Sequence, residues 1–90
     1  MLRINVRKAV SRFVDRLPPK HRQQVKRKIL QLRDDPMPPD SKPLKGEGAF
    51  WRADVGEYRI IYRVEGDTLF VFLVGKRNDA EVYRRLRRLR

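Results

Sequence analysis

The stretch that decides the fold runs from Trp51 to Tyr83, WRADVGEYRIIYRVEGDTLFVFLVGKRNDAEVY. Its first part alternates apolar and charged side chains with a period of two, as a strand with one buried face does. Gly56-Glu57 interrupts the alternation where a two-residue hairpin loop fits, with glycine as the first residue of a type II′ turn. The pattern therefore predicts two antiparallel strands, 51–55 and 58–64, joined by a tight turn.

A turn of fixed length also predicts the register of the two strands. We expect three cross-strand pairs: Val55 with Tyr58, Asp54 with Arg59, and Arg52 with Ile61. One face of this hairpin is apolar and is expected to form the core: Trp51, Ala53, Val55, Tyr58, Ile60 and Tyr62. The opposite face is strongly charged: Arg52, Asp54, Arg59, Ile61 and Arg63. We therefore expect helices on the apolar face and exposed cations on the other.

A further strand and a final helix follow the hairpin. The turn Glu65-Gly66-Asp67 leads into an apolar run at 69–74 without alternation, as expected for a central strand, and Gly75 ends the run. Asn78 and Glu81 have the spacing of a capping box, which predicts a helix start there. Three apolar residues at helical spacing mark the buried side of that helix: Val82, Leu86 and Leu89.

The N-terminal part predicts a strand and two helices. Residues 2–6 alternate as a short strand does, after which the period becomes helical. The apolar residues of the first helix are Val10, Phe13, Val14 and Leu17, and those of the second are Val25, Ile29 and Leu32. Pro18-Pro19 separates the helices and suits the start of the second, which would form an antiparallel hairpin with the first. Prolines and glycines make 34–48 a loop.

These elements predict one α+β domain over residues 1–90, in the order β-α-α-β-β-β-α. We expect a small, mostly antiparallel sheet packed against a helical hairpin, with a C-terminal helix. Lysine and arginine outnumber aspartate and glutamate by 23 to 11, which gives a formal net charge of +12. Such a charge favours polyanionic partners: RNA, DNA, an acidic protein or an anionic membrane.

Composition also narrows the class of site. The chain has no cysteine, which excludes disulfides, thiolate metal sites and thiol nucleophiles and fits a cytoplasmic protein. We expect no metal site and no cofactor. No apolar run approaches the roughly 20 residues of a membrane helix, and residues 1–10 lack the apolar region of a secretory signal, so we expect no membrane association.

The order of elements and several motifs resemble the RelE/ParE superfamily of bacterial and archaeal toxins from toxin–antitoxin pairs. The matching motifs are Leu44-Lys45-Gly46, Trp51-Arg52, the segment GEYRIIY at 56–62, VGKR at 74–77 and EVY at 81–83. The resemblance covers essentially the whole chain. It implies a toxin that cuts mRNA on the ribosome without a metal, by attack of the RNA's own 2′-hydroxyl on the adjacent phosphate.

The resemblance also implies which residues carry this activity. Matching the motifs assigns catalytic roles to Arg59, Arg77 and Tyr83, and we add Arg52. Substrate binding is assigned to Lys45, Lys76 and Arg63. Members of the RelE branch often carry lysines on the strand where this chain has Arg52 and Asp54, so the general base stays open.

The chemistry of these residue types agrees with that assignment. A guanidinium at Arg59 or Arg52 can bind two phosphate oxygens and stabilise the charge of a pentavalent phosphate. Arg77 could clamp the phosphate or protonate the leaving oxygen, and Tyr83 could stack on a base or orient the hydroxyl. Structural roles stay open beside these: Arg59 paired with Asp54, and Tyr83 in the core. His21 is expected to be a packing or solvent-facing residue.

Two other functions stay open. One is a ParE-like inhibitor of DNA gyrase, and the other is an RNA- or ribosome-binding module without catalysis; the fold alone separates neither from a nuclease. For a toxin we expect an acidic, partly disordered antitoxin that wraps the domain, with the ribosome and mRNA as targets. Operator DNA is expected to be bound only through the antitoxin.

Overall fold

The computed structural model describes residues 1–46, 48–78 and 80–89, without the side chains of Glu81 and Leu89. Three helices and five strands follow one another along the chain: β1 Arg3–Val6, α1 Lys8–Asp15, α2 Pro19–Asp34, β2 Ser41–Pro43, β3 Trp51–Val55, β4 Tyr58–Glu65, β5 Thr68–Lys76 and α3 Glu81–Leu89. The predicted α+β class, the two N-terminal helices and the C-terminal helix are confirmed. Within the described ranges, no helix has the length and apolar character needed to cross a membrane.

The strands form one mixed sheet in the order β1-β5-β4-β3-β2. Strand β5 lies between β4, with which it is antiparallel, and β1, with which it is parallel. The predicted central position of this strand is confirmed. The strand is longer than expected, because it continues through Gly75 to Lys76.

The hairpin of β3 and β4 has the predicted register. Asp54 lies opposite Arg59, and the pairs on either side also match the expectation. Gly56 has a φ of +55°, in the left-handed region that the first residue of a primed turn requires. The turn therefore places two oppositely charged side chains next to each other on one face of the sheet.

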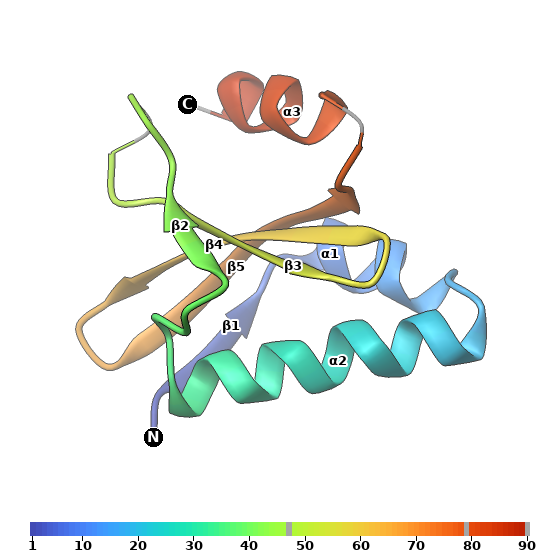
Figure 1. Ribbon diagram of the computed structural model, residues 1–90, viewed down its shortest axis with the longest axis horizontal. Helices are drawn as coiled ribbons and strands as arrows, with labels where there is room; N and C mark the ends of the chain where they lie inside the picture. Colours follow the sequence, from blue (N-terminus) through green and yellow to red (C-terminus); the bar gives the residue numbers. More distant parts are fainter. Residues whose placement is uncertain (47, 79, 90) are drawn as a thin grey trace.

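Helices cover both faces of the sheet, which is a correction to the expected arrangement. Figure 1 shows α2 below the strands and α3 above them, so the sheet is the middle layer. The lower core contains the apolar face of the hairpin, with α1 and α2 packed on it. On the other face, Ile61 and Leu73 are buried under Val82 and Leu86 of α3. Only the part of the charged face that α3 leaves uncovered is open to a ligand.

A second correction concerns the segment expected to be a loop. Residues Ser41–Pro43 form the short edge strand β2, which pairs antiparallel with β3. Its three residues are too few to show a period, and its proline suggests a loop. Proline is nevertheless tolerated at a sheet edge, because an edge strand can leave one side of its backbone unpaired. The capping box expected at Asn78–Glu81 includes Asp79 and the Glu81 side chain, which lie outside the described residues.

The turn glycine yields a test of the register. Gly56→Ala places a Cβ in the left-handed region, which costs about 1 kcal/mol of unfolding free energy. It also brings that Cβ to 2.9 Å from Oε1 of Gln24, whose flexible side chain can move away. We expect urea unfolding to show a loss of about 1 kcal/mol.

Gly66→Ala is the matched control. Gly66 has a φ of +56° in the second two-residue turn, and a Cβ there meets nothing within 4 Å. Both variants should therefore lose similar stability, with Gly56→Ala slightly the worse. A Gly56→Ala protein as stable as the wild type would contradict the turn geometry.

Candidate functional site

The centre of the site is a bidentate ion pair across the β3–β4 hairpin. Nε of Arg59 donates to Oδ1 of Asp54 at 2.7 Å, and Nη2 donates to Oδ2 at 3.1 Å. The Arg59 side chain is only 16% exposed. This pairing was one of the alternatives left open by the sequence, and the structure contains it. It holds the guanidinium in one orientation on the α3 side of the sheet.

Tyr83 reaches the same guanidinium from α3. Nη1 of Arg59 donates to the Tyr83 hydroxyl at 2.5 Å, and the Arg59 Cζ lies 5.7 Å from the centroid of the Tyr83 ring. The ring packs against the core under α3, while the hydroxyl faces the arginine. Tyr83 is therefore a packing residue whose hydroxyl lies at the candidate site.

Two more arginines surround the carboxylate. Nη1 of Arg52 lies 3.8 Å from Oδ2 of Asp54. The pKa of Asp54 lies below its ordinary value of 3.8, chiefly because Arg59 donates hydrogen bonds to it, with the charges of Arg59, Arg52 and Arg77 acting in the same direction against partial burial. The same pair raises the pKa of Arg59. Asp54 is therefore an ionised carboxylate surrounded by cations at neutral pH.

Arg77 and its neighbour Lys76, at the end of β5, lie on different sides of the sheet. The backbone N–H of Arg77 donates to the carbonyl of Glu57 at 3.0 Å, which ties the end of β5 to the hairpin turn beside Asp54. Lys76 pairs with Tyr58, whose side chain lies in the core on the opposite face of the sheet. The structure thus brings Arg77 to the Asp54 cluster and places Lys76 on the other face.

The two remaining predicted residues, Lys45 and Arg63, lie outside this cluster. Lys45 is exposed in the connection between β2 and β3. Arg63 is on the same face of β4 as Arg59, at the other end of the strand, where its Nη2 lies 2.5 Å from Oε1 of Glu65. Neither residue belongs to the cluster of Asp54, Arg59 and Tyr83.

Lys42 is a candidate that sequence reasoning missed. It lies in β2 directly opposite Arg52, so the two side chains share the face that carries the site, and Lys42 is exposed. The sequence contained no sign of β2. A residue expected in a loop cannot be assigned to one face of a sheet, so Lys42 was not recognised as a candidate. Lys42 extends the cationic surface from Arg52 to the edge of the sheet.

His21 lies away from this cluster. Its Nδ1 is 2.8 Å from the Tyr58 hydroxyl, and its Nε2 is 3.6 Å from Oε2 of Glu57. The ring packs edge-on against Tyr58. These contacts agree with the packing role expected for this histidine.

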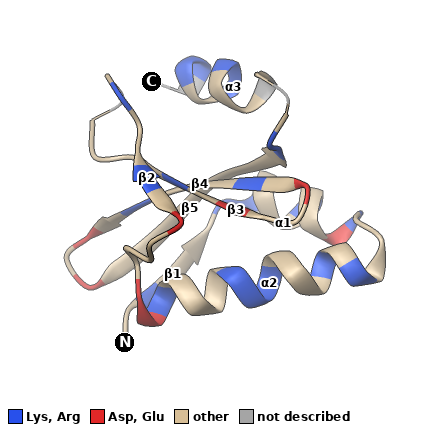
Figure 2. Ribbon diagram, in the orientation of Figure 1, with Lys and Arg blue, Asp and Glu red and all other residues tan. Residues whose placement is uncertain are grey.

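The charge around the site is cationic. Figure 2 shows lysine and arginine along α2, on α3 and on the strands, with fewer and scattered acidic residues. Among the described side chains, Arg52, Arg59 and Arg77 act on the carboxylate of Asp54, and Lys42 lies beside Arg52, so an anion is favoured there. Across the part of the chain that the structure describes, no group of three or more acidic, histidine or cysteine side chains is arranged to hold a metal ion.

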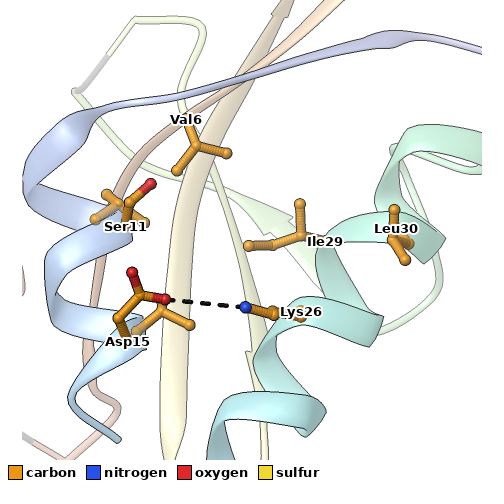
Figure 3. A pocket seen from close by; sticks show the side chains of 8 residues that line it. Val6, Ser11, Asp15, Lys26, Ile29 and Leu30 are labelled. Carbon is orange, nitrogen blue, oxygen red and sulfur yellow. Dashed lines mark ion pairs between the residues drawn. The ribbon is translucent and has the colours of Figure 1, made fainter.

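A hollow of about 350 Å³ lies between α1 and α2, on the far side of the sheet. Figure 3 shows Val6, Ile29 and Leu30 at its sides, with Lys26 and Asp15 facing each other across it. Their closest charged atoms are 3.9 Å apart. Its two charged groups, Asp15 and Lys26, face each other and the rest of its lining is mostly apolar, so the cationic cluster is the stronger candidate site for an anion.

The Asp54–Arg59 pair predicts a pH dependence of stability. Because the pKa of Asp54 is lowered by folding, the pair stabilises the native state above the unfolded pKa and loses that contribution as the pH falls through the folded pKa. Asp54→Asn should lose on the order of 1 kcal/mol at neutral pH. In urea unfolding experiments, the difference in unfolding free energy between the wild type and Asp54→Asn should shrink as the pH falls from about 5 to about 3. A gap that is constant over this range would contradict the assignment.

Comparison with known proteins gives the chain a family. Residues 5–81 match the model of the ParE toxin of the type II toxin–antitoxin system parDE. No curated protein matches the sequence.

Solved structures share the fold. RelE in the archaeal RelE–RelB complex from Pyrococcus horikoshii is 27% identical, with a TM-score of 0.76 over 88% of this chain and 98% of that one. The Mycobacterium tuberculosis toxin–antitoxin complex RelBE2 is 25% identical, with a TM-score of 0.74 over 84% of this chain and 98% of that one. A free mutant of Escherichia coli RelE is 22% identical and has a TM-score of 0.80 over 98% of this chain and 96% of that one, which shows the shared fold. The chain therefore belongs to the ParE toxin family of type II toxin–antitoxin systems, within the RelE/ParE superfamily.

Proposed function

We propose that this toxin is a ribosome-dependent, metal-independent mRNA endonuclease. The observation that carries the proposal is the contact of Arg59 with both Asp54 and Tyr83, with Arg52 beside it. Cleavage by a 2′-hydroxyl needs a proton acceptor, positive charge around the phosphate and a proton for the leaving oxygen. Side chains suited to the first two needs meet at this point of the sheet.

The arginines supply the positive charge. Arg59 is fixed by the Asp54 carboxylate, so little side-chain entropy is lost when one of its remaining N–H groups meets a phosphate oxygen. Arg52 and Arg77 both act on Asp54 by their charge and can bind the non-bridging oxygens as charge develops. This part of catalysis is electrostatic stabilisation by groups already in place.

Asp54 accepts the proton of the 2′-hydroxyl, and the leaving 5′ oxygen takes its proton from a water molecule. Arginine keeps its proton at neutral pH and is a poor base, whereas Asp54 is ionised and has lone pairs that can accept the proton of the 2′-hydroxyl. Tyr83 orients the attacking hydroxyl or stacks on a base. A carboxylate with a lowered pKa is a weak base, so the chemistry depends on positioning, which the ribosome supplies by holding the mRNA.

The partners follow from the same proposal. The structures from P. horikoshii and M. tuberculosis are complexes of a toxin with its antitoxin. We propose for this toxin an acidic antitoxin that is partly disordered when free, in keeping with a net charge of +12. The targets would be mRNA and the ribosome in the cytoplasm, and operator DNA would be bound only through the antitoxin.

Cleavage of mRNA in a programmed ribosome complex tests the nuclease proposal. Arg77→Ala should slow cleavage about 100-fold or more, because it removes charge from the transition state. Tyr83→Phe keeps the ring in its packing place and removes the hydroxyl, so a loss of about 10-fold or more is expected. Arg16→Ala, an exposed arginine at the end of α1, is the control and should cut at the wild-type rate.

Three results would count against the proposal. Wild-type protein that leaves the mRNA intact with and without ribosomes would contradict it. Equal losses in Arg16→Ala and Arg77→Ala would mean that only overall charge matters. If Arg77→Ala weakened RNA binding and its salt dependence while no variant cut RNA, the protein would be a non-catalytic binding module.

A second candidate function is inhibition of DNA gyrase. The observation in its favour is that the matching family model is that of the ParE toxin, whereas the similar solved structures are RelE proteins. A DNA supercoiling assay with purified gyrase decides between them. Under the nuclease proposal, the toxin leaves supercoiling unchanged at concentrations that cut ribosome-bound mRNA.

A further inference from the structure

A second cluster of side chains lies at the other end of the face that carries the candidate site. The Arg63 Cζ is 5.2 Å from the centroid of the Phe50 ring and 4.9 Å from that of the Phe72 ring. The two rings meet edge to face, with centroids 4.9 Å apart. Phe70 lies beside them, with its centroid 6.3 Å from that of Phe72. We call these four residues the aromatic cluster.

A bulge in β5 places the cluster on this face. Ile61 pairs with Leu73, but the next residue of β4, Tyr62, pairs with Val71, so Phe72 is the extra residue. Beyond the bulge, Phe70 lies opposite Arg63. The extra residue puts both phenylalanines on the side of Arg63.

Packing in the core leaves part of the cluster open. Phe50 is buried, whereas Phe70 and Phe72 are partly exposed and the Arg63 side chain is 32% exposed. Nε of Arg63 has no hydrogen-bond partner, so the rings and the ion pair with Glu65 are what hold the guanidinium. The half-buried guanidinium and the partly exposed rings of Phe70 and Phe72 form a surface on which a further planar group can stack.

We propose that the aromatic cluster is a stacking subsite for an unpaired RNA base near the phosphate held by Arg59 and Arg52. This inference rests on the nuclease proposed above and adds a second contact point for the same strand. Single-stranded RNA is commonly bound by aromatic and arginine side chains that stack on its bases, with cations along its backbone.

The distance between the two clusters suits such a strand. Arg59 and Arg63 are four residues apart along β4, or about 13 Å at about 3.3 Å per residue. That separation corresponds to about four base steps at about 3.4 Å each, or fewer in an extended strand. Helix α3 covers Ile61 between them, so the backbone would pass along the open side, over Arg52 and Lys42.

The chemistry favours a nucleic acid over a protein segment at this surface. The route between the clusters carries Lys42 and Arg52, which suit phosphates spaced along a chain. Glu65, an acidic residue that contacts the cluster, is already paired with Arg63. A base can stack on a ring or on the guanidinium without breaking this pair.

Two probes separate stacking from charge: a short fluorescein-labelled single-stranded RNA, and a fully abasic strand of the same length and charge. Fluorescence anisotropy should show that the wild type binds the base-containing strand about tenfold more tightly, the scale of one stacked base. Phe72→Leu should remove most of that preference and leave abasic binding unchanged. Arg63→Lys keeps the charge, loses the flat stacking group and should reduce the preference in the same direction.

Two variants serve as controls. Phe13→Leu makes the same change on the opposite face of the sheet, where Phe13 contacts Tyr58, and should keep the full preference. Arg59→Ala should weaken binding of both strands by the same factor, because it acts on phosphate. Tyr83 can also stack on a base, and a preference that stays intact in both Phe72→Leu and Arg63→Lys would assign stacking to it and overturn the subsite.

Two other results would also overturn the inference: no preference for the base-containing strand in the wild type, or equal weakening of both strands in Phe72→Leu. Thermal melting of Phe72→Leu checks its fold, and Arg63→Lys tests the cluster with all its rings in place. The outcome is separate from that of the cleavage assay. A base preference that depends on Phe72 but occurs without cleavage would sustain the subsite and refute the nuclease.

Discussion

The pairing of Asp54 with Arg59 is the constraint around which the candidate site is organised. A bidentate contact directs the guanidinium across the sheet, where the Tyr83 hydroxyl of α3 meets it, and the ionised carboxylate is balanced by Arg52 and Arg77. Loss of either partner would leave a partly buried charge uncompensated, at a cost greater than the worth of the pair. The same contact thus positions a strand residue and a helix residue whose places in the sequence are far apart.

How far the sequence predicts this arrangement depends on the range of the interaction. The hairpin register could be predicted because a two-residue turn leaves one pairing, and Asp54 lies opposite Arg59 as expected. The edge strand β2 could not, because three residues including a proline show no period, and Lys42 was missed with it. The hydroxyl of Tyr83 reaches Arg59 only once α3 is docked, which is a tertiary contact that periodicity does not encode.

The burial of Ile61 shows where pattern reasoning went wrong on the second face. That face reads as charged, and Ile61 is the one apolar residue among its members on β3 and β4. In the fold it joins Leu73 beneath α3, so a helix is held on a surface expected to be open. A single large apolar residue in a charged row was the available sign of this second core. The helix divides the face into the Asp54 cluster at one end and the aromatic cluster at the other.

The bulge at Phe72 explains why the run 69–74 does not alternate. Leu69, Val71 and Val74 belong to the core of α1 and α2, and Leu73 belongs to the core under α3. The inserted residue shifts the alternation by one position. Odd-numbered residues before it and even-numbered residues after it therefore face the core of α1 and α2. Deleting the extra residue would leave Val71 opposite Tyr62 on the core side and would remove the Phe72 ring from the other face. Insertions and deletions here would change the surface offered to a ligand more than most substitutions do.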